Sequence, residues 1–302
     1  MSRPRWDFDI KTGRVNVLAM RMEIIPTGNA CGAEVRGLDL REPLSKQTAA
    51  QLYDAWLEHL ILFFRDQKIN EEEHLQFTKY FGSPGDYMRP NSLRSSSMQQ
   101  RHRAVMFISN IRKNGEPIGA LPDGEMMFHT DTAYDTTIHK ATTLYSLEVP
   151  SKGGETIFSN QYAVYDALPE DLKKHLDGRI AYTAYEFGTM IKNKDKYNSP
   201  EMRSATHPAL RRHEETQRIS VFVNELMTEK ILGLDEPQTR VILDKIFSLQ
   251  KEARFCYEHQ WKQGDLVIWD NRCSLHARRD FPSHERRLMR RVTISGERPK
   301  WN

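Results

Sequence analysis

The chain is poor in cysteine, and it lacks both a long apolar run and a large excess of one charge. Cys31, Cys256 and Cys273 are an odd number of cysteines without metal-ligand spacing, which excludes a disulfide framework or a zinc ribbon. No segment approaches the ~18 uninterrupted apolar residues of a membrane helix, and charges occupy the N-terminal stretch where a signal peptide needs an apolar run. We therefore expect a cytoplasmic protein with no membrane partner.

The charge balance also excludes a class of partner. The 44 basic and 41 acidic residues leave a net charge of +3 and a pI of about 8.6, whereas nucleic-acid-binding domains are typically more basic, with a pI above roughly 9 and clustered charge. We expect no nucleic-acid partner. The 302 residues suffice for a sizeable core and show no internal repeat or sharp linker. They are divided into an N-terminal arm at 1–21 and a single domain at 22–302.

Short runs of β-branched and aromatic residues, bounded by Gly, Pro, Asn or Asp, predict β-strands. They lie at 61–64, 105–109, 142–147, 155–158, 219–223, 265–269 and 291–294. Apolar residues at helical spacing predict helices that start after Ser45 and Asn70, the second ending at Gly82, and two more at 162–176 and 237–251. This pattern predicts a mainly β fold with inserted helices, a jelly roll of two facing sheets.

Two segments without periodicity are predicted to be lid loops. Residues 83–104 are rich in Ser, Pro and charge, and residues 187–203 are rich in Lys, Asn and Gly. Long irregular segments inside compact domains are usually lids or binding loops.

The run Phe128-His129-Thr130-Asp131 is the best candidate for a metal site. On extended chain His129 and Asp131 would share one face, since strand side chains alternate with period 2. His276, which follows Trp269-Asp270-Asn271-Arg272, is the best candidate for a third ligand. Two histidines and one carboxylate with an open opposite face are typical of oxygen-activating non-haem Fe(II) enzymes. Of the other histidines, five are interpreted as structural or solvated: His59, His74, His102, His213 and His284. Four more have no carboxylate or imidazole at a ligand-like offset: His139, His175, His207 and His259.

An anion site is the second candidate. Gly153 and Gly154 precede a strand that begins near Thr156, and Arg287 and Arg291 would share one face of a strand at an offset of four. Guanidinium groups bind carboxylates bidentately and stay charged. The alternative is a solvated basic face, the usual outcome for such a run.

Together these motifs resemble the taurine dioxygenase and dichlorophenoxyacetate dioxygenase family of Fe(II)- and 2-oxoglutarate-dependent oxygenases, over about residues 22–299. The resemblance implies a cupin-like double-stranded β-helix in which His129, Asp131 and His276 hold iron. It also implies that Thr156 and Arg287 hold the distal carboxylate of 2-oxoglutarate. The family's reaction consumes O2, releases succinate and CO2 and hydroxylates a C–H bond. Family members are often dimers or tetramers, so we expect a homo-oligomer.

The resemblance implies that Arg291 faces the anionic group of the primary substrate. The taurine enzyme has a histidine shortly after the Phe-Gly that ends its second helix, but none follows Phe81-Gly82, and Glu125 stands where that enzyme has an asparagine. We therefore expect a different small organic anion: an aryloxy or alkyl carboxylate, a sulfonate or a sulfate ester. Arg89 and Tyr87 are the further candidates for contacting it. Where the hydroxylated carbon bears a leaving group, cleavage of a C–O, C–S or C–N bond would follow.

Three alternatives stay open. Glu125 would recognise an amine or guanidine under the same oxidative mechanism. A zinc hydrolase would need a positioned base and leaves the spacing of Thr156 and Arg287 unexplained. A non-catalytic jelly-roll binding module would be favoured by loss of a ligand, and none is lost.

Overall fold

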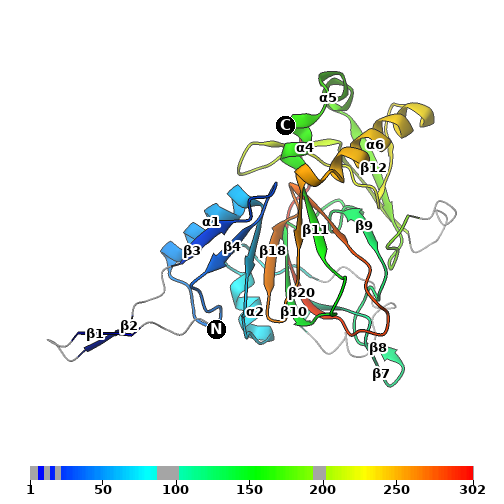
Figure 1. The fold of residues 1–302 in the computed structure, drawn as a ribbon. Coiled ribbons are helices and arrows are strands. Elements are labelled where there is room, and N and C mark those ends of the chain that lie inside the picture. The colour runs from blue at the N-terminus through cyan, green and yellow to red at the C-terminus, as the bar shows by residue number, and fades with distance from the viewer. Residues whose placement is uncertain (1–5, 10–13, 18–21, 87–101, 193–201, 302) are drawn as a thin grey trace.

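Two facing β-sheets form the centre of the computed structural model, which describes residues 6–9, 14–17, 22–86, 102–192 and 202–301 (Figure 1). The larger sheet has the order β3-β4-β5-β18-β10-β20-β6 and the smaller the order β17-β11-β19-β9. In the larger sheet the strands are β3 (Glu23–Pro26), β4 (Ala33–Arg36), β5 (Ile61–Phe64), β18 (Leu266–Asp270), β10 (Ala141–Glu148), β20 (Leu288–Ile294) and β6 (Val105–Ser109). In the smaller they are β17 (Cys256–His259), β11 (Thr156–Asn160), β19 (Ser274–Arg278) and β9 (Met126–His129).

Neighbouring strands in both sheets are antiparallel, apart from the parallel pair β4 and β5. Every side chain of β5 is buried, because the strand has a core on each face. Leu62 and Phe64 pack into the outer core under two helices, whereas Ile61 and Phe63 pack into the core between the sheets. The predicted two-sheet, mainly β architecture is confirmed, with an apolar core between the two sheets.

Helices α1 (Lys46–His59) and α2 (Glu71–Thr78) cover the outer face of the larger sheet (Figure 1). Ser45 caps α1, and Asn70 forms a capping box with Glu73 at the start of α2, both as predicted. The second helix ends at Thr78 and not at Gly82. Residues 79–82 continue as tighter turns, in which the Tyr80 and Phe81 N–H groups bond to carbonyls three residues back.

A third group of elements packs at one end of the two sheets around its own apolar cluster. Its helices are α4 (Gln161–Ala167), α5 (Glu170–Leu176) and α6 (Glu236–Gln250). Its strands are β12 (Ile180–Tyr185), β13 (Arg203–Pro208), β14 (Leu210–Arg212), β15 (Ile219–Val221) and β16 (Thr228–Ile231). The prediction of one helix over 162–176 is wrong, because Pro169 holds Leu168 in an extended conformation and divides the segment.

The remaining elements are the pairs β1 (Trp6–Asp9) with β2 (Arg14–Val17) and β7 (Arg112–Lys113) with β8 (Glu116–Pro117), and the 3-10 turn Ala253–Phe255. Residues 87–101 and 193–201 of the predicted lids lie outside the described part, so the lids, like the boundary of the N-terminal arm, stay predictions. All three cysteines are free, as expected. Within the described ranges, no helix combines the length and the apolar character needed to cross a membrane.

Candidate active site

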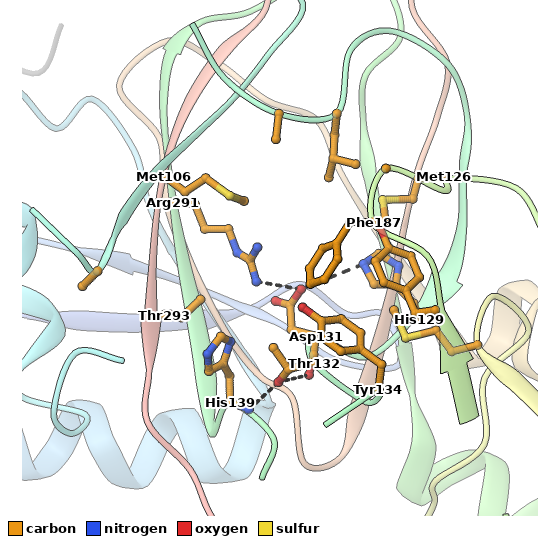
Figure 2. Close-up of a pocket in the computed structure, with 16 residues that line it drawn as sticks. Met106, Met126, His129, Asp131, Thr132, Tyr134, His139, Phe187, Arg291 and Thr293 are labelled. Carbon is orange, nitrogen blue, oxygen red and sulfur yellow. Dashed lines mark hydrogen bonds and ion pairs between the residues drawn. The ribbon is translucent and has the colours of Figure 1, made fainter. Parts of the chain in front are cut away.

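A pocket lined by both polar and apolar side chains opens between the two sheets (Figure 2). Its polar lining comes from His129, Asp131, Thr132, His139, Arg291 and Thr293. Its apolar lining comes from Ala104, Met106, Ala120, Leu121, Met126, Tyr134, Tyr185, Phe187, Gly188 and Met227. Residues from β6, β9, β12 and β20 therefore meet at one place, although they are far apart in the sequence.

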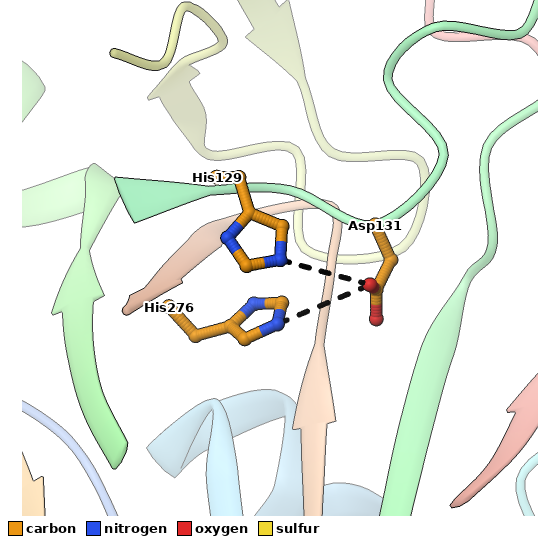
Figure 3. A group of neighbouring side chains, drawn as sticks. All are labelled: His129, Asp131 and His276. Atoms are coloured by element: carbon orange, nitrogen blue, oxygen red, sulfur yellow. Dashed lines mark ion pairs between the residues drawn. The ribbon is translucent and has the colours of Figure 1, made fainter. Parts of the chain in front are cut away.

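His129, Asp131 and His276 converge at this pocket (Figure 3). Strand pairing sets His129 of β9 directly opposite His276 of β19, and their ring centroids are 4.1 Å apart. Asp131 Oδ1 lies 4.0 Å from His129 Nε2 and 3.9 Å from His276 Nε2. The three ligand atoms thus face one point and lie within 4.8 Å of one another, so they form a candidate ligand set for a single metal ion. The predicted clustering of these residues is confirmed.

The reason given for the His129 and Asp131 pairing is wrong in one respect. Strand β9 ends at His129, and Asp131 lies in the turn that follows. Thr132 has φ +59°, in the left-handed region that a β-branched residue rarely adopts. Its hydroxyl donates to the Asp131 carbonyl at 2.7 Å and accepts from the His139 N–H at 2.8 Å, which fixes the turn. The carboxylate is therefore presented by a strained turn, as is common at functional sites.

A chain of hydrogen bonds orients the Asp131 carboxylate. Thr142 Oγ1 donates to Asp131 Oδ2 at 2.6 Å and accepts from Asn271 Nδ2 at 3.0 Å. The Trp269 indole N–H donates to Asn271 Oδ1 at 3.0 Å, which fixes the orientation of that amide. His129 Nδ1 lies 2.9 Å from the Met127 carbonyl, so it carries the proton and leaves Nε2 free as a ligand.

The protonation states also suit a metal. Burial lowers the pKa of His129, and burial together with His129 lowers the pKa of His276 well below its ordinary value, so both imidazoles are neutral near pH 7. Burial opposes ionisation of Asp131, but Arg291 and the two histidines outweigh it and hold the pKa of the carboxyl below its usual range. Arg291 Nη2 lies 2.8 Å from Asp131 Oδ1.

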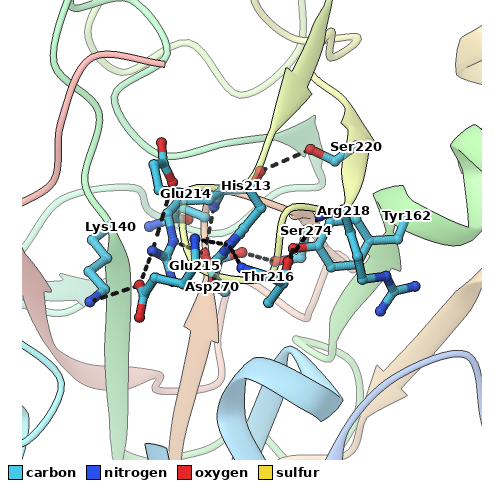
Figure 4. A network of polar contacts seen from close by, with 12 residues as sticks. Lys140, Tyr162, His213, Glu214, Glu215, Thr216, Arg218, Ser220, Asp270 and Ser274 are labelled. Carbon is cyan, nitrogen blue, oxygen red and sulfur yellow. Dashed lines mark hydrogen bonds and ion pairs between the residues drawn. The ribbon is translucent and has the colours of Figure 1, made fainter. Parts of the chain in front are cut away.

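A second network fixes the loop between β18 and β19, just before the strand that contains His276 (Figure 4). Asp270 accepts three hydrogen bonds from Arg272, at 2.7–2.9 Å, and pairs with His213 Nε2 at 3.1 Å. Arg272 also pairs with Glu215, and Ser274 Oγ donates to the Asp270 carbonyl at 2.6 Å. The motif Trp269-Asp270-Asn271-Arg272 therefore fixes the loop that precedes the strand of His276.

His213, Asp270 and Cys273 form a second group with metal-like separations. Both Asp270 oxygens already accept hydrogen bonds, and burial raises the pKa of the Cys273 thiol well above its ordinary value. A neutral thiol and a saturated carboxylate are poor metal ligands, so this group is structural.

Arg287 is buried without a charge partner. Its side chain is 2% exposed, lies against the Phe281 ring and Gly154, and has no ion pair or guanidinium hydrogen bond in the described part of the chain. Burial, and repulsion from Arg278, lower the pKa of Arg287 to about 9. Thr156 Oγ1 accepts from the Trp261 indole N–H at 3.0 Å, which leaves the hydroxyl proton for another acceptor. Both groups could therefore bind an anion.

The other predicted residues divide into three cases. Arg291 lies in the pocket, whereas Arg287 precedes β20 and is not part of the pocket lining. Glu125 is exposed and lines a separate groove with Phe128, Ile157 and Ala277, on the outer face of the smaller sheet, so the expectation that it contacts the substrate is not supported. Tyr87 and Arg89 lie outside the described residues.

Sequence reasoning missed His139, Thr142 and the aromatic wall of Tyr134, Tyr185 and Phe187. Tyr134 and Tyr185 stack with centroids 5.1 Å apart, and Phe187 meets Tyr134 edge-on at 5.3 Å. These residues come together only through the fold, and no local pattern distinguishes them. For Phe187 the position in a predicted lid was the one available signal.

A two-sheet fold with a cluster of two histidines and one carboxylate, and with a buried arginine that has no ion-pair partner among the described residues, is typical of one class, the 2-oxoglutarate-dependent oxygenases. The chain matches the model of the family described as "Taurine catabolism dioxygenase TauD, TfdA family" over residues 23–293, and it belongs to that family. It is 31% identical over 299 residues to pentalenolactone F synthase of Streptomyces avermitilis, covering 93% of this chain and 96% of that protein.

Two further comparisons agree. The chain is 28% identical over 273 residues to the alpha-ketoglutarate-dependent 2,4-dichlorophenoxyacetate dioxygenase of Cupriavidus pinatubonensis, covering 86% of this chain and 93% of that protein. The structure of AAD-2 with Mn(II) and N-oxalylglycine superposes with a TM-score of 0.75 at 25% identity, covering 93% of this chain and 99% of that one. The protein is therefore an Fe(II)- and 2-oxoglutarate-dependent dioxygenase, and the expected family, fold, class of enzyme and cofactors are confirmed.

Proposed function

We propose that His129, Asp131 and His276 hold Fe(II) and that this enzyme hydroxylates a C–H bond of a small organic anion. The observation that carries the proposal is the convergence of three ligand atoms at one point of the pocket, two on neutral buried imidazoles and one on an ionised carboxylate. This donor set suits Fe(II) oxygenases, which keep the opposite face of the metal open.

Arg287 and Thr156 are proposed to bind the distal carboxylate of 2-oxoglutarate. A buried guanidinium without a partner is costly, and an anionic ligand with two carboxylates would remove that cost. The Thr156 hydroxyl supports this assignment, because Trp261 occupies its acceptor side and its proton remains available. A zinc hydrolase would leave the burial of Arg287 unexplained.

Fe(II) held by His129, Asp131 and His276 would, with 2-oxoglutarate and O2, supply the oxidising chemistry that hydroxylates a C–H bond, with release of succinate and CO2. The residues of this chain orient the substrate and exclude water. Met106, Met126, Tyr134 and Phe187 provide apolar surface beside the metal ligands. Arg291 provides the cation, and its guanidinium has five N–H donors, so contact with Asp131 leaves donors for a substrate anion.

The lining favours an anion with an apolar body over an amine. Asp131 is the one carboxylate among the described residues that line the pocket, and Glu125 lies in another groove. Related enzymes are named for a dichlorophenoxyacetate and for a sulfate ester, both apolar bodies with an oxyanion. We therefore propose aryloxy or alkyl carboxylates, sulfonates and sulfate esters as the substrate class. A cytoplasmic location and a homo-oligomeric state remain predictions.

The test is a screen of succinate formation, with Fe(II), 2-oxoglutarate and O2, across carboxylates, sulfonates, sulfate esters and matched amines. We expect at least one anion with an apolar body to stimulate succinate release, and Arg291→Ala to reduce that stimulation by at least ~10-fold, through loss of a charge-assisted hydrogen bond. Stimulation by amines alone, or full activity of Arg291→Ala, would contradict the proposed substrate class. A His276→Ala variant, which lacks one proposed ligand, provides the background rate.

A further inference from the structure

We propose that His139 is a specificity-determining residue of this pocket and that it binds, with Arg291 and Thr293, the oxyanion head of the primary substrate. The inference rests on the proposed function, because it assigns the recognition of the head group within the same pocket. His139 is not one of the three clustered candidate ligands, so its role is distinct from metal binding.

The imidazole of His139 lines the pocket but has an unfilled hydrogen-bonding position. The residue is 7% exposed, and its Nδ1 is buried with no hydrogen-bond partner in the described part of the chain. Such a buried polar atom destabilises the fold if nothing pairs with it. Buried His74 shows the contrast, since its Nε2 bonds to Thr143 Oγ1 and its Nδ1 accepts from Arg290 Nε. His74 is a satisfied structural histidine, and His139 is not.

Hydrogen bonds and close packing hold the backbone around His139, so it cannot easily shift to give the unpaired Nδ1 a partner. Its N–H donates to Thr132 Oγ1 at 2.8 Å, and the next N–H, of Lys140, donates to the Ile294 carbonyl at 2.9 Å. On the other side Gly296 packs so closely that an added Cβ would lie 2.3 Å from the Ile138 carbonyl oxygen and 2.5 Å from Lys140 N. The peptide that carries His139 is therefore clamped between the metal-binding turn and the end of β20.

The three polar groups lie on one side of the pocket (Figure 2). Arg291 and Thr293 alternate along β20 with one residue between them, so both side chains are on its pocket face, and His139 lies beside them. Arg291 supplies the positive charge, Thr293 a hydroxyl donor and His139 an N–H donor. Together they suit the several oxygens of a carboxylate, sulfonate or sulfate group.

The charges that face His139 agree with an anionic ligand. Arg291 is a cation near its ring, opposed by the carboxylates of Asp131 and Asp135, and the Asp86 backbone also lies close to the ring. Asp131 is the proposed metal ligand and Asp135 pairs with Arg203 at 3.5 Å, so neither carboxylate is free to pair with His139. Tyr134 and Phe187 lie across the pocket from Arg291 and His139 (Figure 2), and Tyr185 packs against both rings, so this aromatic wall is suited to the apolar body.

The test compares charged and neutral forms of one probe. Phenoxyacetate and phenoxyacetamide, and hexyl sulfate and hexanol, are titrated calorimetrically into the full-length chain loaded with Mn(II), so that no turnover is required. We expect His139→Leu to weaken binding of both anions about 10-fold while changing the neutral analogues little, and His139→Asn, which restores an N–H donor, to recover most of the loss. His207→Gln is the matched control, a buried histidine outside the pocket lining that also has an unpaired Nδ1.

Three results would overturn the proposal: equal weakening of anions and neutral analogues, unchanged anion binding in His139→Leu, or failure of the unaltered chain to bind either anion. Failure of the proposed function would be seen differently. Anions would then bind and depend on His139, but no anion would stimulate succinate formation. If His139→Leu does not fold, His139→Asn and His139→Gln provide the comparison, because both keep an N–H donor but place it differently.

Discussion

Replacing Thr142 by Val tests whether the hydrogen bonds around Asp131 determine the affinity for metal. The substitution is nearly isosteric and removes one hydroxyl, which donates to Asp131 Oδ2 at 2.6 Å and accepts from Asn271 Nδ2 at 3.0 Å. Thr142 is fully buried, so water cannot replace either bond. A hydrogen bond to a charged group contributes about 1.5–3 kcal/mol, and a partner group left unpaired costs a further ~1 kcal/mol or more. We expect the free energy of unfolding to fall by about 2–4 kcal/mol.

The effect on metal binding follows from the orientation of the carboxylate. Loss of a hydrogen bond that orients a ligand usually weakens metal binding 10–100-fold. At a metal concentration 100 times the Kd of the unaltered chain, the bound ion stabilises the fold by about 2.7 kcal/mol, and a 10-fold loss of affinity reduces this to about 1.4 kcal/mol. We therefore expect Mn(II) to raise the Tm of Thr142→Val by roughly half as much as it raises the Tm of the unaltered chain. Calorimetric titration with Mn(II) measures the affinity directly.

Thr143→Val is the matched control, because Thr143 is the next residue of β10 and is also fully buried. Its hydroxyl bonds to His74 Nε2 and to the Val292 carbonyl, on the face away from Asp131. The control should lose stability and keep the metal affinity. Equal loss of metal affinity in both variants, or unchanged or tighter binding in Thr142→Val, would refute the reasoning. The latter would mean that the bond acts chiefly by withdrawing charge from the carboxylate.

Three further outcomes are expected. Arg287→Met removes a buried unpaired cation, so the free energy of unfolding without cosubstrate should increase by about 1–3 kcal/mol in thermal unfolding. The increase in Tm that 2-oxoglutarate causes in the unaltered chain should disappear. A loss of stability in this variant would contradict the prediction. Burial lowers the pKa of His139 to about 4, so the unfolded chain binds a proton that the folded chain does not between about pH 6.5 and 4. In urea titrations the free energy of unfolding should therefore decrease as the pH is lowered from about 6.5 to 4, by up to about 3 kcal/mol from this group. His139→Leu should make the dependence of this free energy on pH less steep. Asp270→Asn leaves the Arg272 guanidinium and His213 without their buried carboxylate and should cost about 3–5 kcal/mol in thermal unfolding, whereas a change below ~1 kcal/mol would show that the network is dispensable.

The candidate metal ligands and the core strands were predictable because local patterns encode them. The β5 sequence Ile61–Phe64 is apolar throughout, as a strand with a core on each face requires, and Ser45 and Asn70 precede their helices at capping positions. The trio of ligands was found from motif order. The strand geometry assumed for Asp131 was wrong, however, because the chain turns immediately after His129.

The substrate half of the pocket was not predictable from the sequence. His139, Tyr134 and Thr293 meet through a turn and a strand that are distant in sequence, and none of them lies in a recognisable local pattern. The position of Glu125 was not predictable for a related reason. Glu125 is only four residues before His129, but it lies on the outer face of the smaller sheet. The sequence pattern does not predict the conformation of the residues that precede β9.

The register between β9 and β19 is the structural condition on which the proposed metal site depends. His129 and His276 are opposite each other, and a slip of one residue would turn one imidazole to the other face of the sheet. Arg278, two residues after His276, donates to the carbonyls of Leu121, Pro122 and Gly124, shortly before β9 begins, at 2.6–3.2 Å. The register shifts between His276 and Arg278, so this side chain reaches back along the partner strand. Arg278 therefore holds β9 and β19 in the alignment that places His129 opposite His276.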